Sequence, residues 1–431
     1  MARQTRVILS NNTSGANQHG KRTLLDTYPQ LPKLIEGYMR ANLKIGEICE
    51  ALNEDDLIKI GKRSVERIIT DHDLQTVRRS TMTPEEKAYH VLRITQDDVL
   101  GRWGYRLIHE KLIAEGIFIS CKDIMKLRSF ENPAATAARH PTTRKVHSHG
   151  LYSAGPNEEW CLDGHEKILS EMGIAIYGII DKYSRMELEL VAVPNARLAD
   201  VPPMLYLERV RKAGGMPITT TSDMGTEVSK LIPLVTTLRN LCQPFLSEDD
   251  VESFRTVKSI YNITRERGWG PIYRKDLSNL LLFYKAGQIA IGFQAHGDLH
   301  KETALWVWSQ VVKDTLDRIL KESQTHRVRK QKKALLPTGG RRIDFYNLKP
   351  EKWGGKDLLI KVSLEQLEQF KAYDKPEVLR FGTEESIEFC TRRYAEIGAP
   401  EIKAQNAWLI FAMILNLPIP DNWSSTGIPD I

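Results

Sequence analysis

The sequence predicts an α/β core built on a mixed sheet, with helical units before it and a helical region after it. Three observations support this fold class. Apolar residues in 24–130 recur with the 3.6-residue period of amphipathic helices. Short apolar or alternating segments, which are typical of strands, begin only after residue 157. From about residue 230 the helical period returns.

Length and charge indicate how many domains to expect and what kind of partner the protein could bind. A chain of 431 residues with 41% hydrophobic content is long enough for two or more domains with real cores. The net charge is +6, and residues 1–150 hold 24 Lys and Arg against 18 Asp and Glu. The whole excess therefore lies in the first third of the chain. A basic amino-terminal third is compatible with a nucleic-acid partner but does not require one.

Hydropathy and cysteine usage argue against membrane and secreted classes. The longest apolar run, 407–415, is about half as long as a membrane-spanning helix. The first 25 residues are polar and have no apolar signal segment. The five cysteines are scattered singly without a C-x-x-C pair, which indicates neither a disulfide framework nor a cysteine-rich zinc finger. We therefore expect a reducing compartment.

The amino-terminal elements are predicted to be helical. Residues 1–23 are polar and aperiodic, so we expect a disordered tail there. Residues 24–80 contain three short amphipathic segments, which fit a helix-turn-helix DNA-binding unit and equally any small three-helix bundle. The third segment is expected to begin near Ile60 and to present Lys62, Arg63 and Arg67 to solvent.

Residues 81–130 are predicted to form a second helical DNA-binding unit. Pro84 with two following glutamates marks a helix start, and Ser120 is a suitable N-cap for the last helix. That helix carries the candidate DNA-binding residues Lys122, Lys126 and Arg128. Residues 131–157 contain three prolines and no apolar period, and are predicted to be a linker.

The predicted core spans residues 158–333. A short strand at 160–162 is followed by two strands at 173–180 and 186–193 that read as a hairpin. A helix at 201–213 then crosses over to a strand at 217–221, which makes the sheet mixed. The rest of the core is helical and ends in a long helix from 302 to about 326. Residues 334–431 contain one apolar helix and have no assigned role.

Three acidic residues follow or face the predicted sheet edge. Asp163 ends the first strand, Asp223 follows the crossover strand, and Glu266 begins a helix. Carboxylates gathered there would make the all-oxygen ligand set that Mg²⁺ prefers, and two such ions can drive an in-line phosphoryl displacement. Each acid also has an ordinary interpretation, because Asp before Gly is common in turns and Glu266 lies between two arginines.

Four ordered motifs surround these acids: WCLDGHEK at 160–167, IDKYSR at 180–185, SDMGTE at 222–227 and NITRERGW at 262–269. Together they resemble the catalytic core of the DDE transposase/integrase superfamily, in particular Ginger-like transposases and fungal integrase-core proteins. The resemblance covers roughly residues 100–340. It implies an RNase H-like fold with a five-stranded mixed sheet and flanking helices.

The resemblance also implies an activity. Members of this superfamily are Mg²⁺-dependent polynucleotidyl transferases, active in some cases with Mn²⁺, that cut a DNA strand with water and join the freed 3′-hydroxyl to target DNA. Asp163, Asp223 and Glu266 would be the catalytic, metal-binding residues. The resemblance further implies several copies assembled on DNA in the nucleus. Two alternatives stay open: a transposase-derived DNA-binding protein that has lost strand transfer, and a nuclease on the same fold.

Four neighbours of the acids are candidates for supporting roles. His165 shares a strand face with Asp163 and could approach phosphate or a metal-bound water, or be a structural histidine. Asn262 lies one helical turn before Glu266 and could order a water, or simply start the helix. Lys167 could contact DNA or be solvated, and Glu227 could be a reserve ligand or bond within its own turn. We expect the three acidic carboxyl groups to lie within a few ångströms of one point.

Overall fold

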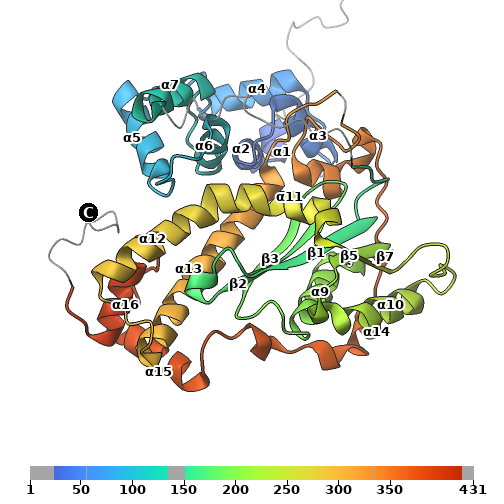
Figure 1. Ribbon diagram of the computed structural model, residues 1–431. Helices are drawn as coiled ribbons and strands as arrows, with labels where there is room; N and C mark the ends of the chain where they lie inside the picture. The colour runs from blue at the N-terminus through green and yellow to red at the C-terminus, as the bar shows by residue number, and fades with distance from the viewer. Residues whose placement is uncertain (1–23, 55, 134–150, 333, 420–431) are drawn as a thin grey trace, which may run out of the picture. The chain divides into compact units, whose positions relative to one another are not determined.

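The computed structural model describes residues 24–54, 56–133, 151–332 and 334–419 (Figure 1). The described residues fall into two compact units: one holds those up to 90 with 109–126, and the other holds 91–108 with those from 127 onward. The tail predicted at 1–23 and most of the linker predicted at 131–157 lie outside the described residues. No helix within the described ranges is long and apolar enough to cross a membrane.

The first unit contains the helices predicted for residues 24–80. Their apolar faces form one core, in which Leu31, Ile48 and Val65 are fully buried or nearly so. The last helix begins at Lys62, close to the predicted start, and Lys62, Arg63 and Arg67 are exposed as expected. The predicted helices are α2 (Leu31–Arg40), α3 (Ile45–Glu54) and α4 (Lys62–Asp71), and a short helix that was not predicted, α1 (Leu24–Thr27), precedes them.

The helices predicted in 81–130 also form, and the Oγ of Ser120 accepts the backbone N–H of Asp123 at 3.0 Å, as an N-cap should. They do not make a unit of their own, because residues 109–126 pack with the first unit, where Ile113 and Phe118 extend the apolar core. A bundle of three short helices has little apolar surface to bury, so added residues stabilise it. The helices are α5 (Pro84–Thr95), α6 (Tyr105–Ala114) and α7 (Cys121–Glu131).

The second unit is organised around a five-stranded mixed sheet in the order β3-β2-β1-β5-β6. The β1–β2 and β2–β3 pairs are antiparallel, whereas the β1–β5 and β5–β6 pairs are parallel. The predicted hairpin and crossover are therefore confirmed. The strands are β1 (Glu159–His165), β2 (Ala175–Asp181), β3 (Glu187–Val193), β5 (Thr219–Asp223) and β6 (Phe254–Val257).

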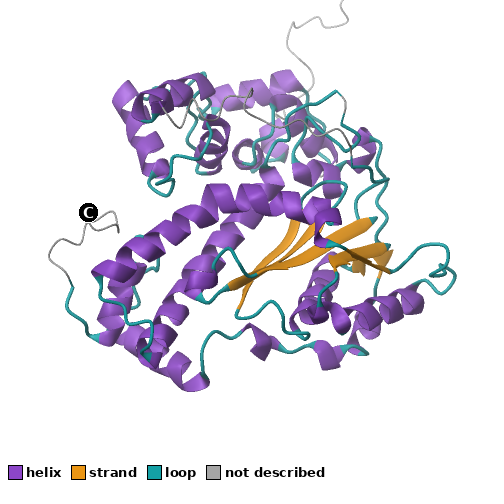
Figure 2. Cartoon of the chain, in the orientation of Figure 1, coloured by secondary structure: helices purple, strands orange, loops and turns teal. Residues whose placement is uncertain are grey.

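Helices cover both faces of this sheet (Figure 2). Trp160 and Leu162 of β1 pack with α9 (Val201–Ala213) and α10 (Leu231–Cys242) on one face. Ile176 and Leu190 pack on the other face with α11 (Ile263–Ile272), α12 (Ser278–Ala290) and α13 (Asp298–Thr325). Strands buried on both faces explain the near-continuous apolar run in β2. The arrangement is the RNase H-like one that the resemblance implied.

The turn between β2 and β3 accounts for the IDKYSR motif. The carboxylate of Asp181 is fully buried and accepts the backbone N–H of Ser184 at 2.7 Å and its hydroxyl at 2.6 Å. A second oxygen of Asp181 accepts the backbone N–H of Asn157 at 2.8 Å. Residues 151–157, predicted as the end of the linker, are thus part of the core.

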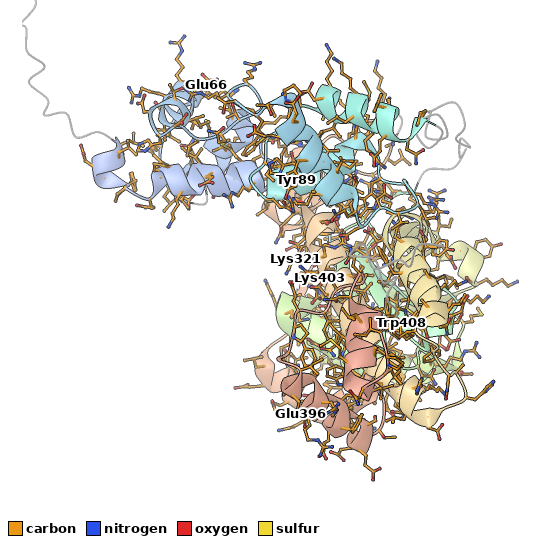
Figure 3. The ribbon with its side chains drawn as sticks, turned by 90° about the vertical axis from the view of Figure 1, so that its left-hand side faces the viewer. Glu66, Tyr89, Lys321, Glu396, Lys403 and Trp408 are labelled. Atoms are coloured by element: carbon orange, nitrogen blue, oxygen red, sulfur yellow. The ribbon has the colours of Figure 1, made fainter. Side chains whose placement is uncertain are left out.

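The carboxyl-terminal region packs on the core. β7 (Ile360–Lys361) pairs with β4 (Gly215–Met216), and α14 (Leu364–Glu368) lies against α9 and α10. α15 (Glu384–Glu396) and α16 (Ala407–Leu415) pack on α13. The indole of Trp408 (Figure 3) donates to the carbonyl of Tyr284 at 2.8 Å and presses on Gly287, where a Cβ would come within 2.1 Å of the ring. Glycine is therefore required at 287.

Candidate active site

Strand register brings two of the predicted acids side by side. Cys161 of β1 lies opposite Thr221 of β5 in the parallel ladder. Asp163 and Asp223 each lie two residues further along their strands, so they are at the same level and on the same face of the sheet. This face is the one that α11 covers, because Asp163 accepts a hydrogen bond from α11. Strand register thus puts these two acids at one edge of the sheet.

The third acid comes from α11, whose start is fastened to β1. The side-chain amide of Asn262, which is buried, donates to the carbonyl of Leu162 at 2.9 Å. Asn262 thus acts as a helix-start residue that joins α11 to the strand beside Asp163. One turn later Glu266 is exposed, and its Oε1 accepts the hydroxyl of Ser259 at 2.5 Å.

Asp163 is the most buried of the three acids, at 9% exposure. Its Oδ2 accepts the indole N–H of Trp269 at 2.7 Å. Burial raises the pKa of Asp163 to about 7; the Trp269 hydrogen bond opposes this rise, while the negative charges of Asp223 and Glu266 add to it. The pKa of Asp223 is also raised, first by burial and then by the charge of Glu266. The three acids are therefore electrostatic neighbours.

Trp269 is held over the sheet by a buried ion pair. Cζ of Arg265 lies 4.0 Å from the centre of the Trp269 ring, and the Arg265 guanidinium makes two contacts with the carboxylate of Glu187. Gly178 lies opposite Asp163 in the β1–β2 ladder, and a Cβ there would be 3.1 Å from both Arg265 and Trp269. A small residue at this position leaves room for the indole.

The role of Trp269 is one that the sequence analysis missed, although the residue stands in the fourth motif. A signal was present: Trp269 follows Glu266 by three residues, and residues three apart share a helix face. If Glu266 is expected to face the sheet, Trp269 on the same helix face can be expected to contact Asp163 as well. The buried partner Glu187 had no comparable signal, because it lies 78 residues from Arg265 in the sequence.

The remaining predicted neighbours have distinct positions. His165 is half-buried with its ring 5.4 Å from that of Trp269, and burial lowers its pKa. Glu227 lies in a short turn, and its carboxyl group folds back over Gly225, two residues from Asp223. Lys167 is exposed. His165 and Glu227 therefore lie beside the predicted acidic residues. Lys167 is exposed to solvent and follows the end of β1.

The expected gathering of all three acidic carboxyl groups around one point is not observed. Among the described residues, no three His, Cys, Asp or Glu side chains are placed to hold one metal ion together. Like charges repel, and Glu266, the most exposed acid, bonds to Ser259 instead of approaching the other two. The donor set nevertheless fits a hard divalent cation, because it consists of carboxylates whose mutual repulsion a positive charge would relieve.

One predicted DNA-binding residue is wrong. Lys122 and Lys126 are exposed, but Arg128 is only 3% exposed. Its guanidinium pairs with Asp98 at 2.9 Å and with Glu131 at 2.7 Å. The physical reason lies in the helix period: Arg128 follows the fully buried Ile124 by four residues and so shares its buried face.

The exposed cations of α4 provide a test of the amino-terminal unit. Charge reversal of Lys62, Arg63 and Arg67 to glutamate is expected to weaken duplex DNA binding and to flatten its logarithmic salt dependence by about 0.9 for each phosphate that the unit no longer neutralises. Titrations of DNA at several salt concentrations measure both quantities. Unchanged affinity and slope would leave this unit as a three-helix scaffold that does not touch DNA.

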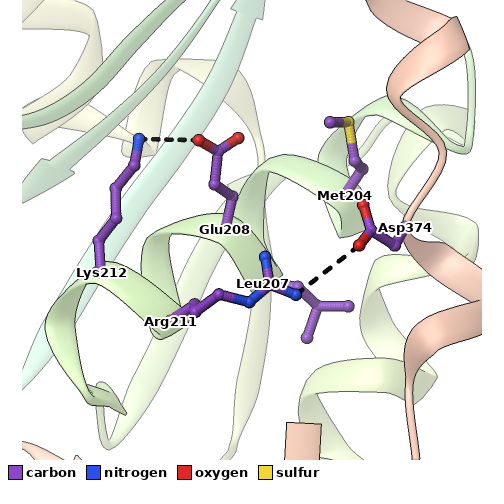
Figure 4. Close-up of a pocket in the computed structure, with 6 residues that line it drawn as sticks. All are labelled: Met204, Leu207, Glu208, Arg211, Lys212 and Asp374. Carbon is purple, nitrogen blue, oxygen red and sulfur yellow. Dashed lines mark ion pairs between the residues drawn. The ribbon is translucent and has the colours of Figure 1, made fainter. Parts of the chain in front are cut away.

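A cavity of about 280 Å³ beside α9 is not a candidate site. Apolar and charged side chains border it together: Met204, Leu207, Glu208, Arg211, Lys212 and Asp374 (Figure 4). Lys212 pairs with Glu208 at 2.9 Å, and Arg211 lies 3.9 Å from Asp374, so these charges satisfy one another. α9 also packs on the sheet face opposite that of the acids.

The comparison with known proteins agrees with this geometry. Residues 151–338 match the family model of an integrase core domain. The chain has no match among curated proteins. The matched residues include all five strands of the sheet and all three acids. Residues 151–338 thus correspond to an integrase core domain, and the match supports the resemblance of this part of the chain to the DDE-type integrase/transposase superfamily.

Proposed function

We propose that the protein is a DNA integrase or transposase that cuts a DNA strand and transfers its 3′ end to another DNA, with Mg²⁺ as cofactor. One observation carries the proposal: Asp163 and Asp223 lie level on adjoining parallel strands, on the face covered by the helix that bears Glu266. The integrase core domain supports DNA as the substrate class. We also propose that several copies act together on nuclear DNA, as the resemblance implies.

In this proposal Asp163, Asp223 and Glu266 would hold the metal, with Mn²⁺ as a substitute for Mg²⁺. Bound ions would supply an activated water or 3′-hydroxyl and stabilise the charge of the in-line displacement. Carboxylate oxygens suit both cations. To bind the metal, Glu266 would give up its hydrogen bond with Ser259. The side chain is exposed, so it is free to make this movement.

Trp269 and His165 would support the metal-binding acids in two ways: by orienting a carboxylate and by exchanging a proton. Trp269 holds Oδ2 of Asp163, so the carboxylate has a set orientation and its Oδ1 stays without a hydrogen-bond donor among the described residues. Both residues are buried, so this hydrogen bond is protected from water. His165, whose lowered pKa favours the neutral imidazole at pH 7, could exchange a proton with a water at the same edge.

The direct test uses the full chain with labelled DNA duplexes and Mg²⁺. Denaturing gels are expected to show nicked strands and longer joined strands, both abolished on chelation and restored by Mg²⁺ or Mn²⁺. Nicks without joined strands would favour the nuclease alternative. Binding with neither product would favour the DNA-binding descendant of a transposase.

Trp269→Phe tests the orientation of Asp163. The phenyl ring keeps the packing but removes the N–H donor, so Mn²⁺ affinity, measured by titration without DNA, is expected to fall about 10–100-fold. Trp160→Phe is the matched control, because it removes a buried indole bond of 2.9 Å to Asn157 on the opposite face of β1. Equal effects of the two substitutions would show that Trp269 contributes only to packing.

A further inference from the structure

The segment 326–342 is the most strongly basic part of the core domain. It contains seven Lys and Arg and no Asp or Glu, so its charge alone exceeds the net charge of the whole chain, +6. Cations that cluster without acids repel one another and attract polyanions. The segment follows α13 directly and overlaps the end of the matched family domain.

Most of this segment is a folded hairpin. Arg327 and Arg341 form an antiparallel bridge, and the backbone N–H of Val328 donates to the carbonyl of Gly340 at 2.9 Å. Nearer the tip, the hydroxyl of Thr338 accepts the backbone N–H of Gln331 at 3.2 Å. The hairpin therefore keeps a definite shape, and binding at its tip costs less ordering entropy than binding by a free tail.

The hairpin is anchored to the turn between β2 and β3. Leu336 is buried against Tyr183 and Phe345. Arg185, which has a φ of 58° in this turn, donates to the carbonyl of Pro337. Both contacts attach the second strand of the hairpin, close to its turn, to the β2–β3 turn.

Three cations in the first strand of the hairpin and towards its tip, Arg329, Lys330 and Lys332, are exposed. No ion pair joins any of them to an acid in the part of the chain that the structure describes. Their charge is thus available to a partner, unlike that of Arg341, which pairs with Asp344. We call these three residues the tip cations.

The tip cations are remote from the acids along the sheet. The β2–β3 turn adjoins the start of β1, where Trp160 lies opposite Asp181, whereas Asp163 lies opposite Gly178 towards the other end. Asp181, the last residue of β2, is three residues beyond Gly178, which corresponds to about 10 Å along the strand. A polyanion at the hairpin therefore does not occupy the acid edge.

We propose that the tip cations form a second DNA contact, which holds the phosphate backbone of a duplex away from the point of cleavage. The inference rests on the proposed function for the choice of DNA as the polyanion. A short basic run can also be a nuclear-import signal. We favour DNA because the hairpin is paired along its length and fastened to the core beside its turn, whereas a peptide signal must be free to extend into its receptor.

The test is the triple variant R329E/K330E/K332E in the full chain. We expect weaker binding to a 30-base-pair duplex and a logarithmic salt slope flatter by up to about 2.7, since each phosphate contact contributes about 0.9. In cleavage assays KM for DNA should rise at least tenfold while kcat stays within twofold, because the acids are untouched. If the variant unfolds, R329Q/K330Q/K332Q replaces it, with smaller shifts in the same direction.

The control is K301E/K361E/K403E, which changes the net charge equally at exposed lysines elsewhere in the same unit. Equal effects of the two triple variants would overturn the proposal and leave only an effect of net charge. Unchanged DNA binding in the tip variant, with weaker binding of an import receptor, would assign the hairpin to import instead. The binding comparison holds even if the wild type never cleaves DNA, so failure of the proposed function and failure of the second contact are distinguishable.

Discussion

Asp163→Asn is expected to abolish strand cleavage and strand joining together while leaving DNA binding intact. Asparagine keeps the size of the side chain and an oxygen that can accept from Trp269, but it removes the charge that would hold the metal. Loss of about 4 kcal/mol of transition-state stabilisation corresponds to a fall of about 10³-fold in the rate of both steps. The measurement is Mg²⁺-dependent cleavage and joining of a DNA end, beside DNA binding by the same protein.

Unfolding is not expected to explain this loss. The pKa of Asp163 is raised above its ordinary value, so the charged form is disfavoured in the folded state and the free energy of unfolding falls as pH rises towards 7. Removing the charge should therefore preserve or increase stability in metal-free buffer at pH 7. Denaturant unfolding of wild type and variant checks this point.

Asp314→Asn is the matched control, because Asp314 is an exposed acid on α13. It should cleave and join like the wild type. An Asp163→Asn protein that still cleaves would contradict the metal role of the strand acids. Cleavage that persists while joining disappears would instead show that the two reactions depend on Asp163 differently.

Arg128→Met is expected to destabilise the second unit by about 3–5 kcal/mol, because it leaves the carboxylate of Asp98 buried without its cationic partner. DNA affinity per folded molecule should not change, since Arg128 is buried. Chemical denaturation measures the first effect, and DNA titration at low temperature measures the second.

Lys126→Met is the control, two residues away on the exposed face of α7, and should change the free energy of unfolding by no more than about 0.5 kcal/mol. Adding Asp98→Asn to Arg128→Met should recover part of the stability, as expected for partners in one ion pair. A stable Arg128→Met protein with weakened DNA binding would mean that Arg128 touches DNA after all.

Local pattern accounts for much of what could be predicted. The period of 3.6 residues identified the helices, including α4 within two residues of its start, and alternation identified β3. The hairpin and the crossover also follow from segments that are consecutive in the sequence. The pairing of β1 with β5 does not, because it joins segments about 60 residues apart, and only the structure shows that Cys161 matches Thr221 and puts the two acids level.

The sequence by itself therefore determined most of the elements and the hairpin and crossover of a mixed sheet. It did not predict β6, which lies in the part of the core that was expected to be helical. Only the tertiary structure decided that Arg128 pairs with Asp98, that Trp269 orients Asp163 across 106 residues, that Glu266 bonds to Ser259, and that residues 334–419 pack on the core. The physical reason is the separation in sequence of the residues that interact. Helix and strand periods arise between neighbours along the chain, whereas the burial of a charge or the donor to a carboxylate depends on contacts between distant segments.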